Sequence, residues 1–145
     1  MSTVAIADTG VLFAYLSRRD AHHLWAVACF QRYTAPLITC EAVLTETMFL
    51  LRRTGADVHK VVEMLRTGML TVGLSAEDEA DRLGALVERY RDRISLADAC
   101  VIRLSELYAG ADVLTTDVTD FSIYRRNGRS ALPLVVPSGM RPRPA

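Results

Sequence analysis

Short apolar runs alternate with longer amphipathic stretches along most of this sequence. Runs that favour buried strands lie at residues 4–7, 36–39, 69–74, 113–116 and 134–136. Between them, apolar residues recur at helical spacing over residues 11–16, 20–33, 41–54, 57–68, 75–90 and 95–110. Strands that alternate with helices in this way predict an α/β fold of three layers, with helices packed on a parallel sheet.

Two helix starts are predicted from their capping residues. Asp20 is the expected N-cap of the second helix, in which Leu24, Val27 and Ala28 follow helical spacing. Ser95 is the expected N-cap of the last long helix, and Asp98 stands where the acid of a capping box is found.

Composition bounds the class of protein. A chain of 145 residues has the length of one domain, and a hydrophobic content of 50% argues against disorder. We predict a single domain over residues 1–137 and an unstructured Pro/Arg-rich tail over residues 138–145. The formal net charge is zero, so no global basic field indicates a nucleic-acid partner, although a local patch can still bind phosphates.

The cysteines and the N-terminus indicate a cytoplasmic protein. Cys29, Cys40 and Cys100 form no C-x-x-C motif and have apolar surroundings, so we expect reduced core residues. Asp8 interrupts the first apolar segment, which argues against a signal peptide. No run reaches the roughly 18 apolar residues that a membrane helix requires, and no membrane association is expected.

Five carboxylates fall outside the helix caps and solvated faces that hold most of the acids. They are Asp8, Glu46, Asp98, Asp117 and Asp120. Asp8 and Asp117 each follow an apolar strand directly, and ligands of open α/β sheets bind at the carboxyl ends of strands. Aspartate is also a common turn residue, and Asp120 either shares the site of Asp117 or starts the turn into Phe121, which is the favoured interpretation.

Glu46 and Asp98 each have a structural alternative. The residues three and four positions from Glu46 are all apolar: Ala42, Val43, Phe49 and Leu50. A carboxylate on a core-facing stripe requires a partner or a metal, whereas a surface glutamate on a helix that is apolar nearly all round does not. Asp98 fits a capping box as well as it fits an inward-facing site.

Four carboxylates in one place repel one another, and divalent cations remove that difficulty. Clusters of oxygen ligands suit Mg²⁺ or Mn²⁺ rather than zinc. Two such ions can activate water and stabilise the leaving oxygen of a phosphodiester. His22, His23 and His59 lack the spacing of a metal motif, and solvated helix positions are expected for them.

Four motifs, in order along nearly the whole chain, resemble those of PIN-domain nucleases. They are Ala7–Thr9 after the first strand, Val43–Glu46 on the third helix, Leu96–Ala99 at the head of a later helix, and Leu114–Phe121 after a strand. Within that family the chain is most similar to VapC-like toxins of toxin–antitoxin pairs. The resemblance implies a PIN-like sheet of about five parallel strands flanked by helices.

The resemblance also implies an activity and partners. It implies endonucleolytic cleavage of single-stranded or structured RNA with Mg²⁺ or Mn²⁺, a homodimer, and a small cognate antitoxin. The implied metal ligands are Asp8, Glu46, Asp98 and Asp117, with Asp120 as a further ligand and Thr9 and Thr116 in support. Gly10 departs from the polar residue frequent in the family, and we expect it to loosen the turn after Asp8.

Three arginine pairs are candidate phosphate contacts: Arg18 and Arg19, Arg52 and Arg53, and Arg125 and Arg126. Three other functions stay open. The chain is alternatively an RNA-processing nuclease that is no toxin, a phosphotransfer or receiver-like domain with Asp8 as the phosphoacceptor, or an inert binding module. Gly10 replaces the second acid of an Asp-x-Asp motif, and a lone lysine, Lys60, disfavours the receiver-like reading.

Overall fold

The sheet of this protein has five parallel strands, as predicted. The computed structural model describes residues 2–140. The strands are β1 (Ala5–Ala7), β2 (Leu37–Thr39), β3 (Leu70–Val72), β4 (Asp112–Leu114) and β7 (Leu134–Val135). They lie in the order β3-β2-β1-β4-β7, and every pair is parallel. β1 and β2 are buried along their whole length, which explains their continuous apolar runs.

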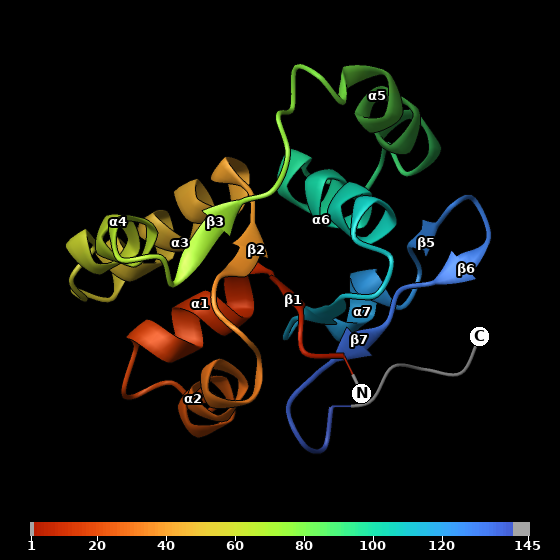
Figure 1. The fold of residues 1–145 in the computed structure, drawn as a ribbon. Helices are drawn as coiled ribbons and strands as arrows, with labels where there is room; N and C mark the ends of the chain where they lie inside the picture. The colour runs from red at the N-terminus through yellow and green to blue at the C-terminus, as the bar shows by residue number, and fades with distance from the viewer. Residues whose placement is uncertain (1, 141–145) are drawn as a thin grey trace.

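Helices cover the sheet on both sides. They are α1 (Thr9–Leu16), α2 (His23–Arg32), α3 (Glu41–Arg53), α4 (His59–Arg66), α5 (Ala80–Arg89), α6 (Leu96–Leu107) and α7 (Val118–Phe121). α1 and α2 lie on one side of the central strands, and α5 and α6 lie on the other (Figure 1). The PIN-like α/β/α arrangement expected from the sequence is therefore confirmed.

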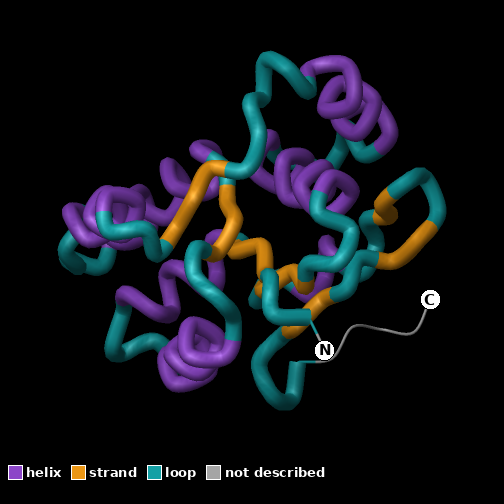
Figure 2. The backbone as a smooth tube through the Cα atoms, in the orientation of Figure 1, coloured by secondary structure: helices purple, strands orange, loops and turns teal. Residues whose placement is uncertain are grey.

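The strand order reverses beside β1. The chain proceeds from β1 outward to β2 and β3, and then returns to place β4 on the other side of β1 (Figure 2). Ala7 pairs with Leu114, and the Asp8 amide donates to the Leu114 carbonyl at 3.1 Å. The residues that follow β1 and β4 consequently begin side by side, at the kind of switch point where α/β sheets bind ligands.

Two local predictions were wrong. Asp20 is not the N-cap of α2, which begins at His23. The Asp20 carboxylate instead accepts the His22 amide at 2.9 Å, in a turn before the helix. The buried face of α2 contains Ala26 and Cys29, whereas Leu24 is 82% exposed.

A short hairpin, β5 (Arg125–Arg126) with β6 (Ser130–Ala131), was not anticipated. Its turn places Asn127 and Gly128 at positive φ.

The remaining expectations concern the cysteines, the tail and membranes. All three cysteines are free and buried, as predicted. Residues 138–140 of the predicted tail form no helix or strand, and residues 141–145 lie outside the described part of the chain. Within residues 2–140, no helix combines the length and apolar character needed to cross a membrane.

Candidate active site

One cavity of about 230 Å³ brings together four of the five acids singled out in the sequence. Asp8 follows β1, Asp117 follows the end of β4, and Glu46 and Asp98 extend from α3 and α6. The other lining residues are Thr9, Gly10, Phe13, Asp20, His22, Leu50 and Thr116. We call this space the acidic cavity.

Thr115 links the two strand ends of the acidic cavity. Its hydroxyl donates to the Asp8 carboxylate at 2.7 Å and accepts the Asp117 amide at 3.0 Å. The supporting residues predicted from the sequence are Thr9 and Thr116, whereas the hydroxyl that bonds both Asp8 and the Asp117 amide belongs to Thr115. Thr116 instead packs on Gly10, and the buried Thr9 hydroxyl has no hydrogen-bond partner among residues 2–140.

Asp98 is directed into the cavity rather than back onto its helix cap. Ser95 caps α6 by accepting the Asp98 amide at 3.0 Å, as predicted. The Asp98 carboxylate accepts the Tyr124 hydroxyl at 2.7 Å. Tyr124 is fully buried and packs edge-on against Phe121 and Tyr90, so the hydroxyl that orients Asp98 is itself held rigidly. Asp98 thus gives its backbone amide to the helix cap, while its carboxylate belongs to the cavity.

Glu46 reaches the cavity from an exposed position. The prediction that it lies on a core-facing stripe was wrong: Val43 is buried, but Phe49 is 60% exposed. α3 therefore has apolar side chains on its solvent-exposed face as well as on its buried face. This is the alternative stated above, a surface glutamate on a helix that is apolar nearly all round. Glu46 meets the other acids because α3 packs against α1, which follows Asp8, and against α6, which carries Asp98.

Asp120 extends the acid group beyond the cavity. One carboxylate oxygen from each of Asp98, Asp117 and Asp120 can be chosen so that all three lie within 4.8 Å of one another. Asp117 caps α7 by accepting the Asp120 amide at 3.1 Å, so Asp120 occupies the predicted turn and also joins the cluster. Arg93 lies 3.4 Å from Asp120 and is the ion-pair partner of this group among the described residues.

The electrostatics of the cavity favour a bound cation. Burial raises the pKa of Asp8 to about 7, although the Thr115 hydrogen bond opposes that rise. Burial, with smaller contributions from the carboxylates of Asp117 and Glu46, raises the pKa of Asp98 to about 6, although the Tyr124 hydrogen bond opposes that rise. The pKa of Asp117 is raised by burial and by Asp120. These oxygen ligands with unbalanced negative charge are the donor set that Mg²⁺ or Mn²⁺ prefers.

Gly10 is required by close packing, not by turn flexibility. It lies within the first turn of α1, where a Cβ would overlap the Oγ1 and Cβ atoms of Thr116. The expectation that Gly10 loosens the turn after Asp8 was therefore wrong. Its missing side chain lets the start of α1 approach the loop after β4.

We expect Gly10→Ala to destabilise the protein by about 1–3 kcal/mol, the usual cost of overpacking. Gly84→Ala is the matched control, because Gly84 also lies inside a helix and a Cβ there meets no atom within 4 Å. It should stabilise the protein by about 0.5–1 kcal/mol through helix propensity. Urea unfolding of both variants checks the prediction, and equal stabilisation by both would contradict it.

The six candidate phosphate-binding arginines divide into two groups. Arg125 donates to the carbonyls of Ser122, Ile123 and Tyr124, and Arg126 donates to those of Ser105 and Ala109. The Arg125 guanidinium therefore stabilises the loop that follows α7, and the Arg126 guanidinium holds the hairpin against the end of α6. The other four are exposed: Arg18, Arg19, Arg52 and Arg53.

Sequence reasoning missed Asp20 and His22 as residues of the cavity. They were assigned to a helix cap and to a solvated helix position, but both line the acidic cavity from the loop before α2. That loop follows α1 in sequence, and only the packing of α1 on α3 brings it opposite Glu46. No local signal in the sequence indicates that packing.

Comparisons with known proteins identify a matching family, a similar sequence and a similar fold. The family model described as PIN domain matches residues 5–126. The chain is 29% identical over 126 residues to the Mycobacterium tuberculosis protein named Ribonuclease VapC26, covering 85% of this chain and 93% of that protein. Its fold also resembles the crystal structure of Mycobacterium tuberculosis VapC20, described as a Sarcin-Ricin loop cleaving toxin. The TM-score is 0.65 at 20% identity, over 75% of this chain and 86% of that one.

Proposed function

This chain belongs to the PIN-domain family, and from that premise we propose that it is a metal-dependent endoribonuclease of the VapC-like kind. The observation that carries the proposal is the acidic cavity, in which Asp8, Glu46, Asp98 and Asp117 meet at the switch point of the sheet. The similarity to a protein named as a ribonuclease supports RNA as the substrate.

Each acid has a defined part in this proposal. Asp8, Glu46, Asp98 and Asp117 would hold the cation, with Asp120 completing the set. When bound, Mg²⁺ or Mn²⁺ supplies activation of the attacking water and stabilisation of the leaving oxygen. Thr115 orients Asp8 and Tyr124 orients Asp98, and Thr9 and Thr116 form part of the wall around them. The low exposure of Asp8 limits competing water at its carboxylate.

The partners follow from the same family likeness. We propose single-stranded or structured RNA as the substrate, a small antitoxin that inhibits the enzyme, a homodimeric state and a cytoplasmic location. The alternative within the family is an RNA-processing nuclease that has no antitoxin. A receiver-like function is disfavoured because the lone lysine, Lys60, lines a different cavity from Asp8.

Removal of divalent metal tests this proposal directly. We expect the purified protein to cleave labelled single-stranded RNA in Mg²⁺ or Mn²⁺, and to lose that activity when the metal is chelated, because the carboxylates alone neither activate water nor stabilise the leaving oxygen. Activity should return on adding excess Mn²⁺. Gel analysis of the fragments provides the measurement. Cleavage that continues at full rate in chelator would contradict a metal-dependent mechanism.

A further inference from the structure

Two further cavities continue from the acidic cavity along helix α1. The first, of about 760 Å³, shares Phe13 and Asp20 with the acidic cavity. The second, of about 640 Å³, shares Leu16, Arg18 and Ala56 with the first. We call these two cavities together the α1 groove. Neighbouring cavities share wall residues, so the groove and the acidic cavity adjoin one another along α1.

The α1 groove contains cations that the fold itself does not use. Arg18, Arg19 and Lys60 line it, and within residues 2–140 their side chains form no ion pair or hydrogen bond. Most other arginines of the chain are engaged, such as Arg82 and Arg103 with Glu106. Isolated cations beside an acidic cavity are available for an anionic ligand.

The acids that line the α1 groove, in contrast, already have hydrogen-bond or ion-pair partners. The Asp20 carboxylate accepts the His22 amide at 2.9 Å, and Asp57 accepts the His59 amide at 2.9 Å. Glu63 is paired with Arg66. Among the described residues none of these acids forms an ion pair with Arg18, Arg19 or Lys60, so the three cations keep their donors for a ligand.

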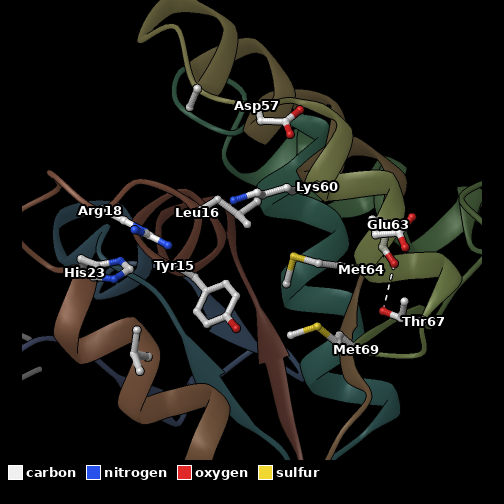
Figure 3. A pocket seen from close by; sticks show the side chains of 12 residues that line it. Tyr15, Leu16, Arg18, His23, Asp57, Lys60, Glu63, Met64, Thr67 and Met69 are labelled. Carbon is white, nitrogen blue, oxygen red and sulfur yellow. Dashed lines mark hydrogen bonds between the residues drawn. The ribbon is translucent and has the colours of Figure 1, made fainter.

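The shape of the groove also suits a nucleotide chain. Figure 3 shows Arg18 and Lys60 directed toward Leu16 from opposite sides of the pocket. The rest of the pocket wall is largely apolar and includes Tyr15, Met64 and Met69. Cations that contact the backbone, combined with aromatic and apolar surface for the bases, are the usual composition of a single-strand binding channel.

We propose that the α1 groove binds the RNA nucleotides on one side of the cleaved bond, with Arg18 and Lys60 contacting their phosphates. The inference rests on the proposed function, because the acidic cavity must hold the scissile phosphate for the groove to hold its neighbours. It extends the arginine prediction by adding Lys60 and by giving the strand a direction: from the acidic cavity past Phe13, along α1, toward α4. A protein segment in the groove is the competing occupant.

Binding of a fluorescent single-stranded RNA at several salt concentrations, without divalent metal, is the first test. We expect Arg18→Ala and Lys60→Ala each to weaken binding several-fold, and to reduce the slope of log affinity against log salt by about 0.7. Arg129→Ala is the matched control, because Arg129 is exposed on the hairpin turn, has no side-chain partner among residues 2–140, and lies outside the groove. Its affinity should stay within about twofold of the original protein.

The conservative variants Arg18→Lys and Lys60→Arg separate loss of charge from loss of fold. Both should retain most of the binding. If Arg18→Ala and Lys60→Ala bind RNA as tightly as Arg129→Ala does, or if the unchanged protein binds no RNA, the proposal is overturned. Unchanged RNA binding would assign the groove to a different ligand, such as a protein segment.

Cleavage in Mn²⁺ provides the second test. We expect the groove variants to raise KM several-fold with little change in kcat. RNA trimmed on the flank that occupies the groove should abolish the difference between variant and original, and trimming the other flank should preserve it. If the original protein lacks metal-dependent cleavage but the variants bind RNA less tightly, the proposed nuclease function is contradicted. The assignment of the groove as an RNA-binding site is then retained. Equal cleavage by all variants overturns the groove alone.

Discussion

Replacing Asp8 with Asn should reduce RNA cleavage by at least about 100-fold, the range in which loss of a metal site's supporting contacts already lowers activity. Asn has nearly the same shape and can still accept the Thr115 hydroxyl, so the variant removes charge and leaves the packing intact. Because Asp8 is buried, it is also the acid whose charge is least compensated by water.

The same variant should become more stable without metal. Burial raises the pKa of Asp8 to about 7, so above that pH the protein must hold a poorly solvated charge. Removing that charge should stabilise the metal-free protein at pH 8 by on the order of 2 kcal/mol. Single-turnover cleavage and thermal unfolding measure the two effects.

Asp81→Asn is the matched control for both effects, because Asp81 is exposed in the first turn of α5. It should change neither cleavage nor stability appreciably. An Asp8→Asn variant that retains cleavage would exclude Asp8 as a metal ligand. A variant that loses both cleavage and stability would indicate that the carboxylate supports the fold instead.

The second large effect is a dependence of stability on pH that metal reverses. The raised pKa values of Asp8 and Asp98, about 7 and about 6, mean that the folded protein binds their protons more tightly than the unfolded chain does. Their contribution to stability is complete below about pH 4 and is lost as pH rises through 6 and 7. As the carboxyl groups of Asp8 and Asp98 ionise over that pH range, the unfolding temperature of the metal-free protein should therefore fall.

Saturating Mn²⁺ should cancel this fall, because the cation compensates the deprotonated carboxylates. Thermal unfolding from pH 5 to pH 8, with and without Mn²⁺, checks the prediction. The Asp8→Asn variant should show a weaker pH dependence in the absence of metal. A metal-free protein that becomes more stable from pH 6 to pH 8 through these groups would contradict the assigned direction of the pKa shifts.

The features predicted correctly from sequence are those with a local cause. β1 and β4 are short apolar runs, and a residue directly after such a run lies at the end of a strand whatever the rest of the fold does. Asp8 and Asp117 could be placed on that basis. The Ser95 cap of α6 also depends only on residues a few positions apart.

The features missed depend on packing between distant segments. Phe49 is apolar and still exposed, so the surroundings of Glu46 could not be deduced from its helical neighbours. Thr115 and Thr116 are chemically identical, and only the pairing of β4 with β1 determines which hydroxyl reaches Asp8. The close contact of Gly10 with Thr116 has the same origin.

The reversal of strand order beside β1 has a consequence for the newly made chain. The Thr115 hydroxyl and the Asp8 carboxylate, 107 residues apart, meet only when β4 has paired with β1. Since synthesis proceeds from the N-terminus, a nascent chain carries Asp8, Glu46 and Asp98 long before it can assemble the acidic cavity. The acidic cavity can therefore form only after β4 and Thr115 have been synthesised, when most of the domain is available to fold.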